Sequence, residues 1–410
     1  MVILACEGQN LFPNLRDLYY EGPSSFTPCL PYLFRPALNI MTFLIQEEGW
    51  DGTRSLSNSP SLVNAAMELS MLTTLKHGHF PTITSLSLWF HTDRKWPLDE
   101  LLSGWNSLEE LDIHAQMDDG LISTMFGLPR LRMLRLRPVG RPAPVAEPQV
   151  VRTVTSSLRR MELKVNNLSW ASNLVASVRK LEISELCIPD ARNARALDVL
   201  LRSVQKSCSR QTLPRFNIRR RTIARSDIPA DWIIAIGLQE LRPLLMFESL
   251  VEVVLQASTL QFVLHDCDIE QLAKAWPRIQ RLELFGNQIH TPTCTLVGLI
   301  SFARHCKDLQ YLCISVDASA TNIPQGTFVD CAQTSLHRLY AYKSPVVKEA
   351  AVASFLSRFF PCIDTIVCKS ITGRTDTYGE HWRKVMDLIP VFVEARRVGI
   401  HGGFPTSSGE

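Results

Sequence analysis

The stretch Trp276-Pro277-Arg278-Ile279-Gln280-Arg281-Leu282-Glu283-Leu284 decides the fold, because its spelling recurs along the chain. An aromatic or apolar residue precedes a proline, and apolar residues then stand at relative positions 0, +3 and +5. Residues two apart point to the same side of a strand, so the +3 and +5 residues share one face. Proline disfavours a helix up to the residue before it. The stretch therefore predicts a helix end, a turn and a short strand with one buried face.

A series of segments fits this 0/+3/+5 pattern, and most of them recur about every 20–30 residues. The segments are Leu15/Leu18/Tyr20, Leu38/Met41/Phe43, Ile83/Leu86/Leu88, Leu108/Leu111/Ile113, Leu131/Leu134/Leu136, Leu158/Met161/Leu163, Val178/Leu181/Ile183, Leu250/Val253/Leu255, Ile279/Leu282/Leu284, Leu309/Leu312/Ile314, Leu336/Leu339/Ala341 and Ile363/Ile366/Cys368. This spacing is typical of leucine-rich repeats. We expect an α/β leucine-rich-repeat solenoid, a horseshoe with short parallel strands on the concave face and helices outside.

The domain organisation follows from the intervals between repeats. We expect a single solenoid over residues 1–401, because stacked repeats share one continuous core. The interval before Leu250 is long enough to hide one or two further units around Phe216 and Ile218. The prediction includes irregular insertions near residues 49–80, 138–150 and 209–235, and a flexible tail over residues 402–410.

Helices are expected between the strands. The predicted ranges are 119–126, 194–208, 268–276, 293–306 and 346–360. Residues 378–397 should form one helix, or two short helices broken near Pro390. Asp268 would cap the third of these helices. The residue three positions before each repeat, such as Trp276 or Cys306, should be the last core contact of the preceding helix.

Composition excludes several functional classes. The 410 residues carry a net charge of +3 and are 46% hydrophobic, which does not indicate a nucleic-acid or membrane-surface binder. The apolar runs are shorter than the roughly 18–20 residues that span a bilayer. The eleven cysteines are scattered and contain no Cys-x-x-Cys, so we expect a reducing compartment, the cytoplasm or the nucleus.

No sequence motif points to catalysis or to a cofactor. Walker, Gly-x-Gly-x-x-Gly, Gly-x-Ser-x-Gly and His-Glu-x-x-His motifs are all absent. His77 and His79 lack further ligands at metal-binding spacing, and a turn explains them better. Cys306 should lie in the core and Cys313 on the outer side of its strand, without a basic neighbour to activate it. The prediction is a non-enzymatic protein with no catalytic, cofactor or metal site.

The basic stretch from Arg215 to Asp231 has no clear period, so we expect a surface loop there. Its cluster from Arg215 to Arg225 could contact phosphate or an acidic partner. A solvated basic loop is the competing and favoured interpretation, because runs of Lys and Arg are weak motifs.

The partner-binding residues are predicted from the strand periodicity. Residues at +2, +4 and +6 alternate with the core positions and should line the concave face. In the C-terminal half this face gathers tyrosine, phenylalanine and arginine, which are enriched at protein interfaces. The predicted protein-binding residues are Arg281, Glu283, Phe285, Tyr311, Arg338, Tyr340 and Tyr342. The alternative is that the aromatic residues are ordinary strand formers.

A family resemblance adds to this reading. The run Leu241-Arg242-Pro243-Leu244-Leu245-Met246-Phe247, the acidic start of the next helix at Asp266 and Asp268, and the ending Ala275-Trp276-Pro277 resemble the repeat region of fungal F-box proteins, especially those of basidiomycete mushrooms. Phe12-Pro13-Asn14-Leu15, followed by Leu33-Phe34 and Pro36, resembles the start of that repeat array.

The resemblance implies a substrate receptor of an SCF-type ubiquitin ligase, in which an F-box binds the Skp adaptor and the repeats recruit a target protein. Residues 1–11 are too few to form an F-box. Skp adaptor and cullin are therefore expected partners only if an F-box is supplied. The alternative is a regulatory or signalling scaffold with leucine-rich repeats that is unrelated to ubiquitination.

Overall fold

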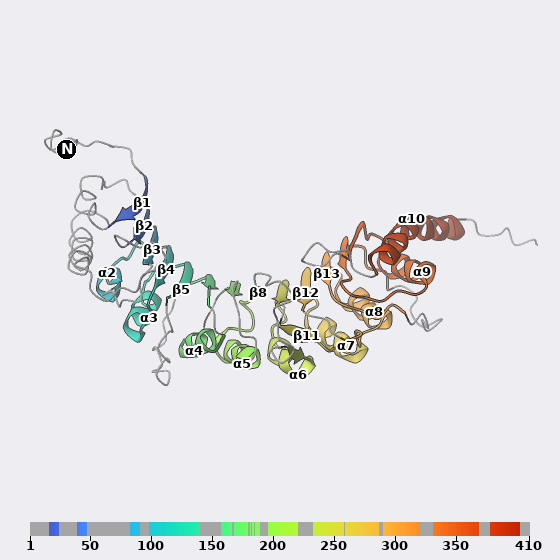
Figure 1. Ribbon diagram of the computed structural model, residues 1–410, viewed down its shortest axis with the longest axis horizontal. Helices are drawn as coiled ribbons and strands as arrows, with labels where there is room; N and C mark the ends of the chain where they lie inside the picture. The colour runs from blue at the N-terminus through green and yellow to red at the C-terminus, as the bar shows by residue number, and fades with distance from the viewer. Residues whose placement is uncertain are drawn as a thin grey trace, which may run out of the picture. The chain divides into compact units, whose positions relative to one another are not determined.

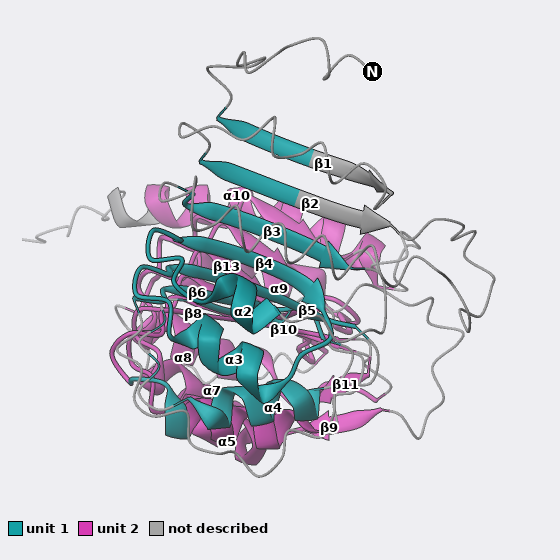
Figure 2. Cartoon of the chain, turned by 90° about the vertical axis from the view of Figure 1, so that its left-hand side faces the viewer, with its two compact units in different colours: residues 1–188, 206–209 teal, residues 189–205, 210–410 magenta. Residues whose placement is uncertain are grey.

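The computed structural model describes most of the chain. The described residues are 16–23, 39–46, 83–90, 98–139, 157–165, 168–178, 181, 183, 185–188, 196–219, 233–257, 259–286, 290–319, 331–368 and 378–401. The predicted insertion at 49–80, the tail at 402–410, and His77 and His79 lie outside these residues. Strands and helices alternate, and the strands pair in parallel, so the fold class is α/β as predicted. The chain divides into two compact units, residues 1–188 with 206–209 and residues 189–205 with 210–410 (Figure 2).

Unit 1 carries seven parallel strands in sequence order. They are β1 (Asp17–Pro23), β2 (Ile40–Gln46), β3 (Ser85–Phe90), β4 (Glu110–Ala115), β5 (Met133–Pro138), β6 (Arg160–Leu163) and β7 (Glu185–Ile188). The register aligns the +3 residues, because Leu111 pairs with Leu134 and Leu134 with Met161. These residues are buried, as the 0/+3/+5 pattern predicts.

The helices of unit 1 are α2 (Leu98–Leu102), α3 (Asp119–Phe126) and α4 (Leu168–Ser177). Figure 1 shows α2 and α3 on the same side of strands β3 to β5. The predicted range of α3 is confirmed, and Asp118 caps this helix by accepting a hydrogen bond from the Leu121 amide at 2.8 Å. Helix α5 (Leu197–Ser207) crosses the division between the units.

Unit 2 carries six parallel strands in sequence order. They are β8 (Arg215–Arg219), β10 (Glu252–Gln256), β12 (Arg281–Phe285), β13 (Tyr311–Cys313), β14 (Arg338–Tyr340) and β15 (Thr365–Val367). Leu282, Leu312 and Leu339 align across neighbouring strands and are buried. A second, two-stranded sheet pairs β9 (Ile234–Ile236) with β11 (Leu260–Phe262), which the sequence pattern did not reveal.

The helices of unit 2 follow the strands. They are α6 (Leu238–Leu241) with the 3-10 turn η6 (Arg242–Leu244), then α7 (Asp266–Ala275), α8 (Leu296–His305), α9 (Glu349–Phe359) and α10 (Gly379–His401). Figure 1 shows α6, α7 and α8 on one side of strands β8, β12 and β13. Pro390 lies inside α10, and the helix continues through it as a single element.

The residue three positions before each repeat anchors unit 2, as predicted. The residues in this column are Phe247, Trp276, Cys306, Gln333 and Phe360, and all are buried. Trp276 donates its indole N–H to the Leu244 carbonyl at 3.1 Å. The Gln333 amide donates to the Leu309 carbonyl at 2.7 Å and accepts from the Leu336 amide at 2.8 Å. Trp276 and Gln333 thus satisfy backbone carbonyls of the preceding repeat, which buried polar groups require.

Helix α7 begins earlier than predicted. His265 is its N-cap, and Asp268 stands at the third helical position, where its carboxylate accepts from the His265 amide at 2.9 Å. Asp268 therefore caps from within the helix. Asp266 instead binds the next repeat, since its Oδ1 accepts from the Thr295 amide at 2.7 Å.

One strand lies later in the sequence than predicted. The triple Val178/Leu181/Ile183 predicts a strand around Leu181, but the strand of this repeat is β7. Ile183, Leu186 and Ile188 also fit the 0/+3/+5 pattern, and Leu186 pairs with Met161. Leu181 forms an isolated bridge with Cys208.

The prediction of an irregular insertion near 209–235, with a surface loop from Arg215, is also wrong in part. Residues 215–219 form β8, with Leu213, Phe216 and Ile218 buried at 0/+3/+5. The prediction of a hidden unit around Phe216 and Ile218 is confirmed. The intervening arginines made the segment look aperiodic.

Candidate functional site

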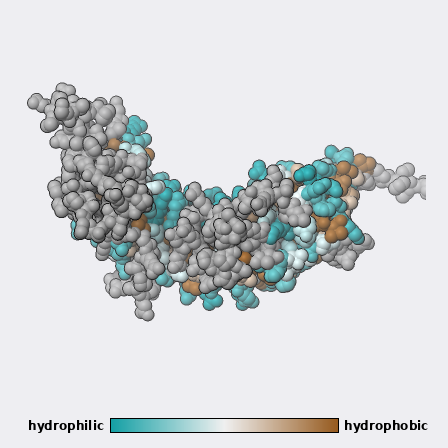
Figure 3. All heavy atoms as spheres, in the orientation of Figure 1, coloured by the Kyte–Doolittle hydropathy of each residue, from teal (hydrophilic) through white to brown (hydrophobic). Residues whose placement is uncertain are grey.

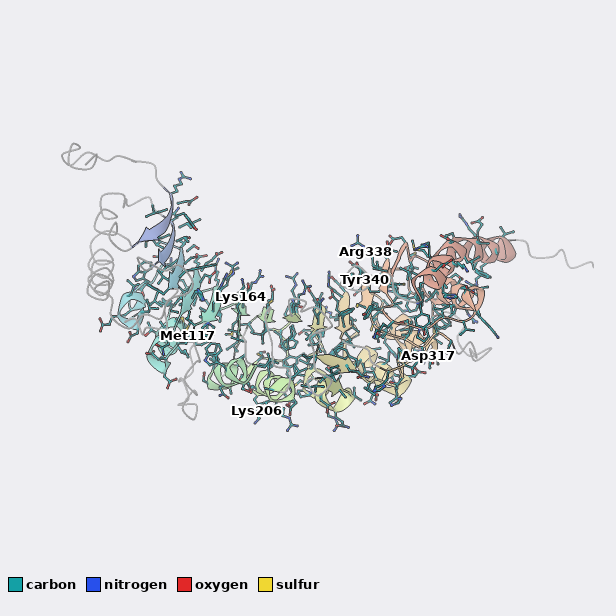
Figure 4. The ribbon with its side chains drawn as sticks, viewed as in Figure 1. Met117, Lys164, Lys206, Asp317, Arg338 and Tyr340 are labelled. Atoms are coloured by element: carbon teal, nitrogen blue, oxygen red, sulfur yellow. The ribbon has the colours of Figure 1, made fainter. Side chains whose placement is uncertain are left out.

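The candidate site is the face of the unit 2 sheet on the side away from its helices, which we call the unit 2 strand face. Figure 4 shows Arg338 and Tyr340 of β14 on this side of the sheet. The face comprises the +2, +4 and +6 residues of β8 to β14. They are Arg215, Asn217, Arg219, Glu252, Val254, Gln256, Arg281, Glu283, Phe285, Tyr311, Cys313, Ser315, Arg338, Tyr340 and Tyr342.

An ion pair lies at the centre of this face. Arg281 and Glu283 stand two apart on β12, so their side chains leave the same side of the strand. Arg281 Nε donates to Glu283 Oε1 at 2.7 Å, and a terminal nitrogen of the same guanidinium also contacts this oxygen. Burial would lower the pKa of Arg281, but the Glu283 carboxylate raises it overall. The guanidinium is therefore charged and held in one position.

Two tyrosine rings extend this centre. The Arg281 guanidinium carbon lies 4.2 Å from the centre of the Tyr311 ring, a cation–π arrangement. The ring centres of Tyr311 and Tyr340 lie 4.9 Å apart, across diagonal positions of β13 and β14. Burial raises the pKa of Tyr311, and the nearby Glu283 carboxylate adds to the increase. The Tyr311 hydroxyl is therefore neutral, and both rings are partly exposed.

A second aromatic pair lies beside the first. The ring centres of Phe285 and Tyr342 are 5.0 Å apart, although their strands are separated by β13. The residue between them in this column is Ser315, whose hydroxyl donates to the Tyr342 carbonyl at 2.8 Å and leaves room for the rings.

The structure brings most of the seven predicted partner-binding residues together. Arg281, Glu283, Tyr311 and Tyr340 form one cluster, and Phe285 and Tyr342 form the second. Glu283 and Tyr342 are buried, so they support the surface from below. Arg338 is exposed, and its side chain has no ion-pair or hydrogen-bond partner among the described residues.

The strand face also includes two arginines that sequence reasoning placed in a loop. Arg219 lies 3.9 Å from a carboxylate oxygen of Glu252 and 3.9 Å from one of Glu283. Arg215 lies 3.9 Å from Glu252. The signal that could have identified them is the 0/+3/+5 triple at Leu213, Phe216 and Ile218, which fixes their place in the columns.

The corresponding face of unit 1 has a different composition. Arg137 donates to Asp112 at 3.0 Å, and its guanidinium lies 4.3 Å from the Trp89 ring centre. Trp89 also meets His114 edge to face, with ring centres 5.9 Å apart. Burial raises the pKa of Asp112 even though Arg137 opposes the shift.

The thiols near the unit 2 face lack the chemistry of a nucleophile. Cys313 lies in the predicted outward column, at the register position between Glu283 and Tyr340, but its side chain is buried there. Burial raises the pKa of both thiols, that of Cys306 to about 12. Among the described residues there is no cluster of three or more His, Cys, Asp or Glu side chains that could hold a metal ion. Within the same residues, every helix is too short or too polar to cross a membrane.

No protein-family model and no curated protein matches this sequence. The arrangement of residues on the unit 2 strand face is therefore the basis for any functional argument. This face combines partly exposed rings, a fixed guanidinium and an arginine, Arg338, that has no side-chain partner among the described residues. These groups do not provide a nucleophile, a general base in a cleft or a phosphate cradle.

Proposed function

We propose that the chain is a leucine-rich-repeat solenoid of the horseshoe type that binds another protein without catalysing a reaction. The observation that carries this proposal is the cluster of Tyr311, Tyr340 and Arg281 on the unit 2 strand face. Tyrosine and arginine supply a large contact area, and side chains that are already held lose little conformational freedom on binding.

The repeat geometry supports the solenoid part of the proposal. Parallel strands follow in sequence order within each unit, with the 0/+3/+5 residues buried and the +2/+4/+6 residues on the strand face. A protein with such strands presents one long row of side chains per column, which suits an extended partner.

We further propose that the bound protein is the target of an SCF-type ubiquitin ligase, and that this chain acts in the cytoplasm or the nucleus. The support is the resemblance of residues 241–277 to fungal F-box proteins. Because the Skp adaptor and cullin are expected only if an F-box is supplied, affinity purification of the full-length gene product, with any F-box encoded ahead of residue 1, tests this part. Enrichment of the Skp adaptor and cullin supports a ligase role, whereas their absence when an F-box is present favours a scaffold unrelated to ubiquitination.

The binding role is tested by selecting random linear peptides displayed on phage against the immobilised full chain. Selected peptides should lose binding to Tyr340→Ser, which removes an exposed ring, and keep binding to Lys206→Ala. Lys206 is exposed on α5, on the helix side in Figure 4. Tyr342→Ala is unsuitable because its buried ring supports the fold. The proposal fails if no selected peptide distinguishes Tyr340→Ser from the parent chain.

A further inference from the structure

The unit 2 strand face has a surplus of positive charge. Among the residues that the structure describes, the cations of this face are Arg215, Arg219, Arg281 and Arg338, and its acids are Glu252 and Glu283. The cations are also the more exposed groups. The side-chain exposed fractions are 56% for Arg215, 44% for Arg219 and 39% for Arg281, against 23% for Glu252 and 8% for Glu283. The acids therefore lie below the guanidinium groups, and a partner meets the positive charges first.

The hydrogen-bonding capacity of these arginines is only partly used. A guanidinium has five N–H donors. Arg215 and Arg219 lie 3.9 Å from their carboxylates, which is too long for a hydrogen bond. Arg338 has no side-chain partner among the described residues. Donors on three arginines are thus available to an incoming carboxylate.

Tyr311 lies between Arg281 and Arg338 across the strands, and Tyr340 lies on β14 at the position diagonal to Tyr311. Strands β8, β10, β12, β13 and β14 are successive neighbours, so about 19 Å separates the two ends of the face at roughly 4.8 Å per strand. Arg215 and Arg219 stand at the β8 end and Arg338 at the β14 end. Tyr311 and Tyr340 lie near the Arg338 end, with Arg281 between them and β8.

We propose that the unit 2 strand face binds an extended, acidic segment of its partner protein. About six or seven residues of extended chain cover 19 Å. Acidic side chains at the two ends would pair with Arg215 or Arg219 and with Arg338, and an apolar or aromatic residue between them would pack on Tyr311 and Tyr340. Charge complementarity selects this partner, since a basic segment would meet repulsion from every exposed group. This inference rests on the proposed binding function and names the chemistry of its ligand.

The test uses the same displayed peptides and two charge reversals of equal size. Selected sequences should contain more Asp and Glu than Lys and Arg, and the affinity of a synthetic selected peptide should fall as sodium chloride rises. Arg338→Glu should weaken binding at least about tenfold, because it replaces an attraction with a repulsion. Lys206→Glu changes the net charge identically on the helix side and should leave the affinity within about twofold.

The outcomes separate the two proposals. Arg338 is exposed and has no side-chain partner within the described part of the chain, so its variants should keep the circular dichroism spectrum and melting temperature of the parent chain. Peptides that depend on Tyr340 but are neutral or basic overturn the acidic ligand and leave the binding function intact. The same holds if Arg338→Glu and Lys206→Glu behave alike. If no peptide depends on Tyr340, both proposals fail.

Discussion

The strand faces of the two units are built from the same columns of the same repeat, but they differ in how their cations are paired with acids. On β4 to β7 of unit 1, the cations Arg135, Arg137, Arg160 and Lys164 face the acids Glu110, Asp112, Glu162 and Glu185. Every one of these cations has a carboxylate within 3.0–3.4 Å. On unit 2, three arginines share two acids, and Arg338 has no acidic partner among the residues that the structure describes.

On unit 1 the cations of the strand face are paired with acids of the same face. On unit 2 the arginines outnumber the acids, so some guanidinium donors are not used within the face. Paired charges on neighbouring strands contribute little to stability, but they leave few donors for a partner. A surplus of guanidinium groups beside partly exposed rings has the opposite character. The same backbone can therefore carry a face with paired charges and a face with a surplus of arginine, and the +2, +4 and +6 residues distinguish them.

The largest expected effect concerns the anchors beneath the two faces. Trp276→Ala removes a fully buried ring and leaves the Leu244 carbonyl without its donor, so we expect a loss of about 3–5 kcal/mol. Trp105 of unit 1 is also buried, but its indole nitrogen has no hydrogen-bond partner among the described residues. Trp276→Phe should therefore cost about 1–2 kcal/mol, and Trp105→Phe less than about 1 kcal/mol.

Hydrogen exchange with mass spectrometry measures this difference locally. Trp276→Ala should accelerate exchange in α7 and β12, with little change in β4 and α3. Equal acceleration in both regions would show that the two units lose structure together. Equal costs for the two Trp→Phe changes would show that the indole hydrogen bond contributes nothing.

Much of the fold was predictable because it depends on buried apolar residues. In repeats such as Ile279/Leu282/Leu284 the apolar positions determine the strand register. Both ends of α3 were predicted correctly. The failures have local causes. Two overlapping triples around Ile183 gave the wrong strand, and charged neighbours concealed β8. The small β9 and β11 have only three residues each, too few for a period to emerge.

The candidate site was predictable only as a set of columns. Periodicity placed Arg281, Tyr311 and Tyr340 on one face, but their mutual stacking depends on side-chain conformations that no spacing encodes. Burial of Glu283 and Tyr342 likewise depends on what the neighbouring strands place over them. The role of Gln333 was missed because a buried glutamine becomes recognisable only through the carbonyls around it.

An intermediate effect is expected at the buried acids of the two faces. Glu283→Gln leaves Arg281 and Arg219 without a shared carboxylate, so the free energy of unfolding should fall by about 1–2 kcal/mol, moderated because both arginines reach solvent. Asp112→Asn should change the free energy of unfolding by less than about 0.5 kcal/mol at neutral pH. Burial destabilises the charged carboxylate of Asp112, and this cost offsets the stabilisation from its ion pair with Arg137. Urea titrations of both variants measure these changes. A larger loss for Asp112→Asn would contradict the comparison.

The pH dependence of Asp112 has a definite sign. Burial raises its pKa in the folded protein, so the folded protein takes up a proton before the unfolded chain does as the pH falls. The parent chain should therefore gain stability relative to Asp112→Asn as the pH falls through the folded pKa, until the unfolded chain is also protonated. The difference between the two unfolding curves between neutral and acidic pH isolates this group. A parent chain that loses stability relative to the variant over this range would reverse the assignment.

The smallest effect on stability separates pairing from binding most directly. Lys164 of unit 1 lies 3.4 Å from Glu162, and Figure 4 shows it on the strand side of unit 1. Lys164→Ala should lower the free energy of unfolding by about 0.5 kcal/mol and leave peptide binding unchanged. Arg338→Ala removes a cation that pairs with no described residue, so stability should stay within about 0.5 kcal/mol of the parent chain while peptide affinity falls.

Helix α10 of unit 2 carries exposed apolar side chains in addition to the charged strand face. Figure 3 shows hydrophobic residues beside hydrophilic ones where α10 lies, and Val391 and Val398 of that helix are each 61% exposed. A Val391→Ser, Val398→Ser variant measured beside Arg338→Ala separates the two contributions. If the serine variant loses the peptide and Arg338→Ala keeps it, binding occurs on α10, and the surplus of arginine on β8 to β14 only keeps that face hydrated.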